Sequence, residues 1–227
     1  MKRGWNGDEV KRVLLALTTG VLLAGCGGAQ PAVKYGADGK SRMPFKPLLW
    51  TFDADSVGAP PPGSTVFSGT WLVRAEPDAP SAPNAVCQTG TADFPALELG
   101  ETVFTDFAFQ ARFKPISGRT DQAGGLIFRI QGKDDYYILR ANALEGNVNF
   151  YKYAGGRRSS LAEGKAKVEA GKWQELRVAV SGSRFRGLLD GKQVVDVTDD
   201  SYQAGRVGLW TKADSVTCFD DVEVKAP

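Results

Sequence analysis

Two-residue alternation dominates residues 124–153, which read GGLIFRIQGKDDYYILRANALEGNVNFYKY. Leu126, Phe128 and Ile130 fall on one side of the first segment, and Tyr137 and Leu139 fall on one side of the second. Alternation of this kind, interrupted by Gly, Asp and Asn, is typical of half-buried β-strands joined by tight turns. The stretch therefore predicts three antiparallel strands with one face on a core and the other in water.

The polar side of these strands combines guanidinium, amide and phenol groups. Its residues are Arg129, Tyr136, Arg140, Asn142, Asn149 and Tyr151. Planar polar groups hydrogen-bond pairs of sugar hydroxyls, and an aromatic ring packs on the C–H face of a sugar. Two interpretations remain open: a ligand site, or a solvated wall whose Arg and Tyr side chains cover apolar stems.

The rest of the sequence from Leu48 onward consists of short segments with the same alternation. Strands are predicted in LLWTFDAD, TWLVRAE, AVCQTG, PALELG, TDFAFQARFK, WQELRVAVSG, GRVGLWTKAD and VTCFDDVEV. APPPGSTVF and PDAPSAPNA are predicted loops, because their prolines bar regular structure. In RFRGLLDGKQVVDV, Asp190-Gly191 suits the type I′ turn of a hairpin. Residues 157–171 contain helix-forming residues but no 3.6-residue apolar stripe, so they predict a short strand and a loop.

About a dozen short strands without a convincing helix predict an all-β fold, a two-sheet antiparallel sandwich. Residues 48–227 are ample for one hydrophobic core and show no second boundary. We therefore expect one sandwich domain over residues 48–227.

Four basic residues precede an apolar run over residues 13–23 and the sequence LAGC, which ends at Cys26. This pattern predicts a secretory signal peptide over residues 1–25, with an apolar run too short to span a bilayer. LAGC resembles the lipobox of bacterial lipoproteins, which implies cleavage before Cys26 and lipid attachment to it. A plain signal peptide with a chance cysteine is the alternative.

Residues 26–47 are rich in Gly, Pro and small polar residues, so they predict a lipidated cysteine and a flexible tether. Several acyl chains on one residue anchor a protein stably to a membrane. Gly27 follows the cysteine, and the aspartate that resembles an inner-membrane retention signal is missing there. We therefore expect a lipid-anchored protein of the cell envelope, placed at the outer membrane, whose only membrane contact is its anchor.

Charge and histidine content narrow the function classes. The whole chain has 28 basic residues (Lys and Arg) and 26 acidic residues (Asp and Glu). Residues 1–25 contain four of the basic and two of the acidic residues, so 24 of each remain after the predicted signal peptide. This balance gives no reason to expect nucleic acid as a partner. Histidine is absent, which excludes Ser-His-Asp and Cys-His arrangements and metal sites that need imidazole.

Cys87 and Cys218 remain as an even pair once Cys26 carries lipid. Export places them where disulfides persist, so the sequence predicts a bond between them. Cys218 shares a face with Val222 and Val224 by simple alternation, which predicts that it points inward. The bond would close a loop of about 130 residues. Two separate buried thiols are the alternative.

Two further groups of residues are candidate site residues. Trp210 falls on the same side of its strand as Lys212 and Asp214. A tryptophan there either stacks on a sugar whose hydroxyls the two charged groups hold, or packs under a loop.

Asp53 lies in the first predicted strand, and Asp220 and Asp221 lie in the last. The first and last strands of a sandwich commonly pair, which would bring these carboxylates together as ligands for a structural calcium. Exposed acidic residues that cap strand ends are the alternative. We expect no other cofactor.

Three segments carry a family resemblance. They are GGLIFRIQGKDDYYILRANALEGNVNFYKYAGGRR, KWQELRVAVSGSRFRGLLDGKQVVDV and GRVGLWTKADSVTCFDDVEV. They resemble bacterial laminin-G-like domains of the concanavalin A-like lectin/glucanase superfamily, among them 3-keto-disaccharide hydrolase-type and family 16 glycoside hydrolase-like domains. The resemblance runs from residue 48 to 224 and implies a jelly roll with a concave sheet that carries a sugar site.

Glucanases of that superfamily use a strand motif E-x-D-x-x-E, whose carboxylates lie about 5.5 Å apart. Glu76-Pro77-Asp78 is the only E-x-D, and no second glutamate follows it. Asp221 and Glu223 share a face, but at the end of the last strand. We therefore expect no catalytic residues and a carbohydrate-binding or adhesive module for a carbohydrate or cell-envelope glycan. The alternative is a glycoside hydrolase-type, sugar-processing enzyme whose carboxylates the sequence does not identify.

Overall fold

The computed structural model describes residues 34–35, 41–42 and 46–227. The chain divides into two compact units, Met1–Met43 and Pro44–Pro227. In the first unit, β1 (Lys34–Tyr35) pairs with β2 (Ser41–Arg42). The predicted signal peptide, its lipobox and Cys26 lie outside the described residues, as does most of the predicted tether. No helix among the described residues is long and apolar enough to cross a membrane.

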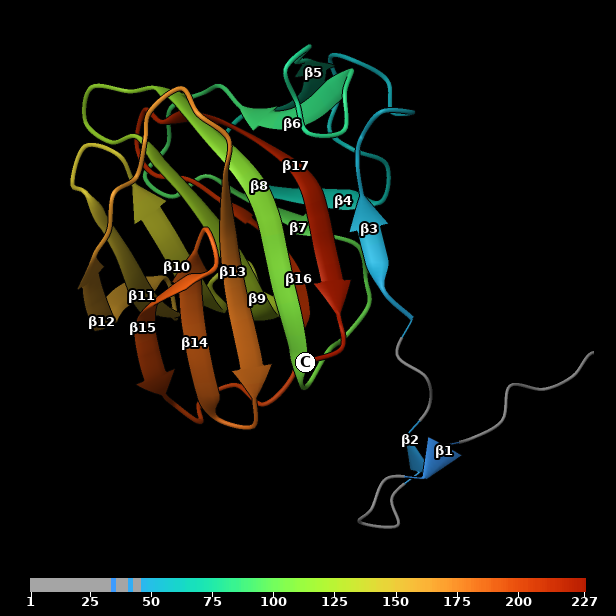
Figure 1. Cartoon of the computed structure of the whole chain (residues 1–227), viewed down its shortest axis with the longest axis vertical. Coiled ribbons are helices and arrows are strands. Elements are labelled where there is room, and N and C mark those ends of the chain that lie inside the picture. The colour runs from blue at the N-terminus through green and yellow to red at the C-terminus, as the bar shows by residue number, and fades with distance from the viewer. Residues whose placement is uncertain (1–33, 36–40, 43–45) are drawn as a thin grey trace, which may run out of the picture. The chain divides into compact units, whose positions relative to one another are not determined.

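Two antiparallel sheets form the second unit (Figure 1). The seven-stranded sheet runs in the order β12 (Arg157–Lys165), β11 (Asn147–Ala154), β10 (Asp135–Asn142), β9 (Ala123–Gly132), β16 (Arg206–Trp210), β7 (Ala96–Leu99) and β4 (Ser64–Ser68). The eight-stranded sheet runs in the order β15 (Lys192–Thr198), β14 (Arg184–Leu189), β13 (Gln174–Ser181), β8 (Phe107–Ser117), β17 (Val216–Lys225), β6 (Asn84–Gln88) and β5 (Trp71–Ala75), and β3 (Leu48–Trp50) pairs with β17.

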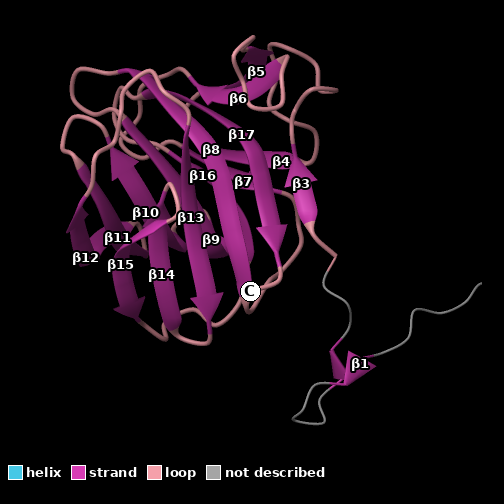
Figure 2. Ribbon diagram, viewed as in Figure 1, coloured by secondary structure: helices cyan, strands magenta, loops and turns pink. Residues whose placement is uncertain are grey.

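The predicted fold class is confirmed. The strands within the two sheets pair antiparallel, and the described residues contain strands, turns and loops without a helix (Figure 2). The first and last strands of the unit pair, as expected, with Trp50 opposite Val222. Asp190 and Gly191 both have positive φ, at 48° and 76°, which is the backbone of the predicted type I′ turn. Residues 157–165 form a strand, also as predicted. The strand at Ser64–Ser68 was missed, because proline precedes it and the sequence predicted a loop.

The hydrophobic core lies between the two sheets. Leu126, Phe128, Tyr137 and Leu139 from the seven-stranded sheet are fully buried in it, as the alternation predicted. Facing residues of the eight-stranded sheet complete the core, for example Phe185, whose ring centroid lies 5.8 Å from that of Phe128. The other side of the seven-stranded sheet, turned away from this core, is called the outer face below.

A bulge at Arg129 corrects the predicted alternation in β9. Strand β16 pairs Val207 with Phe128 and Arg206 with Ile130, so Arg129 has no partner in the ladder, and its φ is 49°. An extra residue reverses the side on which the following residues lie. Ile130 therefore joins the outer face instead of the core.

The Arg129 side chain accordingly lies on the inner side, not on the predicted ligand face. It is 1% exposed, its guanidinium lies 5.0 Å from the Phe185 ring centroid, and it donates to the backbone carbonyls of Tyr202, Thr105 and Gly182. These bonds connect β9 with loops at one end of the sandwich. Arg129 is thus a structural residue.

A second bulge changes the predicted orientation of Cys218. In β17, Asp220 pairs with Arg112 and Glu223 pairs with Gln110, so two residues oppose one, and Asp221 has a φ of 45°. Val222 consequently faces the core while Cys218 faces the opposite side of the sheet, in a cluster with Ala79 and Ala85. The prediction that Cys218 points toward the core with Val222 and Val224 was wrong, because it assumed unbroken alternation.

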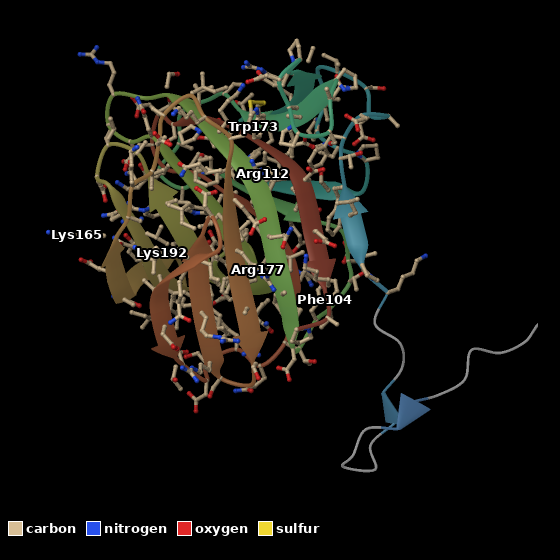
Figure 3. The ribbon with its side chains drawn as sticks, viewed as in Figure 1. Phe104, Arg112, Lys165, Trp173, Arg177 and Lys192 are labelled. Atoms are coloured by element: carbon tan, nitrogen blue, oxygen red, sulfur yellow. A yellow bond between two sulfur atoms is a disulfide. The ribbon has the colours of Figure 1, made fainter. Side chains whose placement is uncertain are left out.

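The predicted disulfide is confirmed. Cys87 of β6 lies directly opposite Cys218 of β17, with their Cα atoms 4.0 Å apart, and a bond joins their sulfurs (Figure 3). It links two neighbouring strands of the eight-stranded sheet across 131 residues of sequence.

Candidate functional site

The outer face of the seven-stranded sheet is largely buried, which corrects the expectation of a wet face. Tyr136, Arg140, Asn142, Asn149 and Tyr151 are each at most 6% exposed. They do project from this face, because their strand neighbours Tyr137, Leu139, Ala141, Val148 and Phe150 enter the core. Loop residues and long side chains cover them, so the alternation located the face correctly but not its solvent exposure.

Trp210 packs under a loop, the second of the two alternatives open from the sequence. Its side chain is fully buried on the outer face, and the Phe94 ring stacks over it with centroids 5.8 Å apart. The Arg158 guanidinium crosses from β12 and lies 4.4 Å from the Tyr151 ring centroid and 5.9 Å from that of Trp210. A sugar ring therefore has no open indole face to stack on.

Arg140 is the centre of a polar network on this face. It donates 2.5 Å and 2.8 Å hydrogen bonds from Nη2 to the Glu145 carboxylate and to Asn147 Oδ1. Its guanidinium also lies 5.5 Å from the Tyr151 ring centroid and 4.0 Å from an Asp121 oxygen. Burial acts to raise the pKa of Glu145, but hydrogen bonds from Arg140 and Asn147 outweigh it and lower that pKa. Glu145 therefore accepts hydrogen bonds as a carboxylate and is a poor general acid.

A polar hollow of about 310 Å³ lies beside this network. Its lining consists of Glu145, Gly146, Asn147, Asn149, Glu163, Gly164 and Lys165. The lining comes from β11, from edge strand β12 and from the turn between β10 and β11. Glu145 keeps 43% of its side chain exposed although Arg140 holds it, so its carboxylate is fixed and accessible together.

An aromatic hollow of about 350 Å³ occupies another part of the outer face. Its lining consists of Phe67, Ser68, Asp93, Phe94, Ala96, Lys133, Asp134, Tyr136, Tyr153 and Gly156. The rings of Tyr136 and Tyr153 stack with centroids 4.9 Å apart, and the Phe94 ring meets Tyr153 edge-on at 5.6 Å. Lys133 pairs with Asp134 at 2.5 Å, and burial raises the pKa of Tyr153. The hollow thus combines aromatic walls with carboxylates.

Asn142, Lys212 and Asp214 hold a loop in place rather than line either hollow. Asn142 Nδ2 and Lys212 Nζ donate to the two oxygens of the buried Asp121 carboxylate, at 2.7 Å and 2.8 Å. The Asp214 carboxylate accepts from the backbone N–H groups of residues 119–121, which lowers its pKa. The expectation that Lys212 and Asp214 flank an open Trp210 therefore has no counterpart in the structure.

The three candidate calcium ligands do not meet, although their strands pair. Asp53, Asp220 and Asp221 do not bring their carboxylate oxygens within 4.8 Å of one another in the part of the chain that the structure describes. Asp220 is fully buried and accepts from the backbone and hydroxyl of Ser81, both at 2.7 Å. Asp53 accepts from the backbone of Asn84. Pairing of the first and last strands was predicted correctly, but β3 ends at Trp50, so Asp53 lies in the turn after the strand and not in it.

The E-x-D segment serves structure on the other sheet. The carboxylates of Glu76 and Asp78 both bind Lys114 Nζ, at 2.6 Å and 2.7 Å, and that ammonium lies 5.0 Å from the Trp173 ring centroid. This cluster belongs to the eight-stranded sheet, away from both hollows. Carboxylates do line the outer face, however, since Glu145 and Glu163 share one hollow and Asp93 and Asp134 share the other.

Sequence reasoning missed several residues of the two hollows. Glu145 and Asn147 lie in a stretch interpreted only as a turn, and Phe94 lies in a loop between two short strands. Glu163 and Lys165 could not be placed beside the polar hollow, because a register shift between β11 and β12 at Phe150/Tyr151 changes which residues of the two strands lie opposite each other. The turn at residues 143–147, which reads ALEGN, did indicate a site, because it has a carboxylate and an amide two residues apart beside the predicted polar face.

Comparison with known proteins identifies the family of this sandwich and proteins that share its fold. Residues 76–225 match the family model of the 3-keto-alpha-glucoside-1,2-lyase-like domain. A levanase of Bacillus subtilis (strain 168) is 28% identical over 164 residues, which is 70% of this chain and 22% of the levanase. The chain thus spans about a fifth of the length of that relative.

Solved structures share the fold. The carbohydrate binding module CBM66 from Bacillus subtilis superposes with a TM-score of 0.61 at 24% identity, over 72% of this chain and 96% of the module. A Bacillus subtilis protein with a galectin-like fold gives a TM-score of 0.52 at 13% identity, over 71% of this chain and 88% of that one. These likenesses agree with the predicted concanavalin A-like jelly roll. With two thirds of its length matched by the family model, the chain belongs to the 3-keto-alpha-glucoside-1,2-lyase-like domain family.

Proposed function

We propose that the outer face of the seven-stranded sheet binds a carbohydrate, without catalysis. The aromatic hollow supports this function most directly, because it surrounds one space with the rings of Tyr153 and Phe94 and the carboxylates of Asp93 and Asp134. Aromatic rings pack on the C–H surface of a sugar while carboxylates accept hydrogen bonds from its hydroxyls.

The polar hollow supplies a second set of contacts on the same face. Glu145 and Asn147 present planar acceptor and donor groups whose positions Arg140 fixes through two hydrogen bonds. Groups that are already held in place lose little conformational entropy when a ligand binds, which favours affinity. A carbohydrate of several units would contact both hollows.

The relatives support the same proposal. The fold is shared with a carbohydrate binding module, and a stretch of a levanase is similar in sequence to 70% of this chain. We accordingly assign the chain a carbohydrate or cell-envelope glycan as partner.

A glycan array followed by calorimetry on the ligands found tests the proposal. Tyr153→Ala removes an aromatic wall of one hollow, and Glu145→Gln removes the charge of the other. Loss of a ring contact worth about 1.4 kcal/mol weakens binding about 10-fold. We expect a loss of that size for Tyr153→Ala and of about 3- to 10-fold for Glu145→Gln.

Glu223→Gln is the matched control, because Glu223 also pairs with a basic side chain on a strand, but in the eight-stranded sheet. The control should bind as the wild type does. If both outer-face variants bind every ligand with wild-type affinity while remaining folded, the outer face does not bind carbohydrate.

A sugar-processing enzyme is the second candidate function. The family description and the two pairs of carboxylates that line the hollows favour it. Incubation with 3-keto-glucosides and with neutral oligosaccharides, followed by chromatography of the products, tests it. Turnover that Asp93→Asn or Asp134→Asn abolishes would support the enzyme, whereas no turnover of any substrate that binds would support a binding module.

We also propose that the chain is a lipoprotein of the cell envelope, anchored through Cys26. LAGC at the end of the apolar run supports this, together with the Gly/Pro-rich stretch that follows it. Mass spectrometry of the mature protein from its bacterial host should find acylated Cys26 as the first residue. An unmodified first residue elsewhere would contradict the proposal.

A further inference from the structure

A third hollow, of about 430 Å³, opens at the edge of the sandwich. Its lining consists of Lys165, Ala166, Lys167, Leu189, Asp190, Lys192, Gln193 and Val194. These residues come from the end of β12 in one sheet and from the β14–β15 hairpin in the other. We call it the lysine hollow. Figure 3 labels two of its lysines, Lys165 and Lys192.

The lysine hollow carries an excess of positive charge. Over the described part of the chain, neither Lys165 nor Lys192 has a carboxylate oxygen within 4.0 Å of its ammonium. Lys167 pairs with Glu169 at 2.9 Å, but its side chain is 85% exposed. Asp190 is the only acidic residue of the lining, and its oxygens accept from Gln174 Nε2 at 2.7 Å and from the Glu175 backbone at 2.8 Å. Both oxygens of the Asp190 carboxylate therefore already accept hydrogen bonds from β13.

The floor of the hollow is apolar. Leu189 is buried, and Val194 and Ala166 are half-buried against the core. Gly164 makes a close approach between the sheets possible, because a Cβ there would lie 2.5 Å from Val194 Cγ1. An apolar floor with cationic side chains above it suits a ligand that has both a carbon skeleton and a negative charge.

The lysine hollow adjoins the polar hollow at Lys165, which lines both. In the polar hollow, Glu145 and Glu163 disfavour a negative substituent, whereas the lysine hollow favours one. A chain of sugars that passes over Lys165 would therefore place an uncharged unit by Glu145 and an acidic unit by Lys192.

We propose that the preferred ligand is an acidic glycan, whose carboxylate or sulfate group is bound in the lysine hollow by Lys165 and Lys192. This inference rests on the proposed carbohydrate-binding function and names its substrate class. The two lysines act as electrostatic contacts, so the preference for an acidic glycan weakens as salt screens them.

Dextran, carboxymethyl-dextran and dextran sulfate of equal length test the proposal, since they share one backbone and differ in charge. Affinity is measured by calorimetry with the purified protein at low and high salt. The proposal predicts that at least one of the two acidic polymers binds about 10-fold more tightly than dextran at low salt. The double variant Lys165→Gln/Lys192→Gln should bind that acidic polymer about 3- to 10-fold more weakly than the wild type does. Which polymer binds best distinguishes a carboxylate from a sulfate.

Lys46→Gln is the matched control, because Lys46 is an exposed lysine that lines none of the three hollows. It should retain the affinity for the acidic polymer. Equal binding of all three polymers, or an equal loss in the control and in the double variant, would overturn the proposal. The proposed function would survive either result as long as Tyr153→Ala and Glu145→Gln still weaken the binding of a neutral glycan.

Discussion

Trp210 is fully buried on a sheet face that no second sheet covers. The Phe94 ring stacks on the Trp210 indole, and the Arg158 guanidinium lies over it. Gly125 pairs with Trp210 on the neighbouring strand and leaves room for the indole, because a Cβ at Gly125 would lie 3.3 Å from the ring. A satellite core of aromatic rings therefore stabilises the outer face and forms the base of the aromatic hollow.

We expect Trp210→Ala to unfold more easily than the wild type by about 3–5 kcal/mol, because it leaves a cavity under Phe94 and Arg158. Chemical denaturation monitored by circular dichroism measures the difference. Leu49→Ala, at a side chain that is 60% exposed, serves as the control and should change stability by less than about 0.5 kcal/mol. A loss below about 1 kcal/mol for Trp210→Ala would contradict the satellite core.

Asp199 links three residues near one end of the sandwich. Tyr137 Oη donates to it from the core, Lys152 pairs with it at 3.1 Å, and the Ser201 backbone donates to it at 2.9 Å. Burial acts to raise the pKa of Asp199, but hydrogen bonds from Ser201, Tyr137 and Lys152 outweigh it and hold that pKa far below its ordinary value. For Tyr137, burial and the hydrogen bond to Asp199 raise the pKa to about 12.

A lowered carboxyl pKa contributes stability above the unfolded value of about 3.9 and loses it as the pH falls toward the folded value. Asp199→Asn should therefore lower the unfolding free energy by about 1–2 kcal/mol at pH 7, since bonds to a charged group weaken. Denaturation across the pH range measures this gap, which should stay constant at neutral pH and shrink below about pH 4. A gap that grows in acid would contradict the assignment, and Asp200→Asn, at an exposed neighbour, should show no such trend.

At the scale of elements, the disulfide joins β6 to β17 within the eight-stranded sheet. Cross-linking residues 131 positions apart limits the unfolded chain, which contributes roughly 4–5 kcal/mol in the chain-entropy model. Cys87→Ala/Cys218→Ala should lose about that much stability in urea denaturation, and dithiothreitol should affect the wild type but not the double variant. Equal stability with and without the bond would contradict this estimate.

Most strands could be predicted because their alternation and turn residues are local properties of the sequence. The three central strands at residues 124–153, the β14–β15 hairpin and the pairing of the first and last strands follow from such signals. The bulges at Arg129 and Asp221 could not be predicted, since residues with positive φ other than glycine leave little trace in the sequence. Each bulge moved the side chains after it to the other face.

The candidate site could be predicted only as a face. Arg140, Asn149 and Tyr151 lie together on it as expected, but the covering by Phe94 and Arg158 depends on long-range packing. Strand β12 enters through a register shift, so Glu163 and Lys165 could not be assigned to that face in advance. Asp53, Asp220 and Asp221 do not gather as a group of ligands in the described part of the chain, because β3 ends at Trp50 and Asp53 lies in the turn after it.

At the scale of the whole molecule, the eight-stranded sheet carries the disulfide and the buried Lys114 cluster, while the seven-stranded sheet carries the aromatic and polar hollows. One sheet thus carries the covalent cross-link, and the other carries the groups that we propose bind carbohydrate. This division agrees with the proposal that a glycan binds mainly on the outer face and reaches the other sheet only at the lysine hollow.

Amide chemical-shift mapping by NMR during titration with a glycan identified on the array tests the central claim most directly. We predict that the largest shifts fall on residues 145–165 and around Phe94 and Tyr153, which line the hollows of the seven-stranded sheet. Residues of β8, β13 and β17 on the opposite sheet should shift little. Shifts concentrated on those three strands, with none along β10–β12, would contradict a binding site on the outer face.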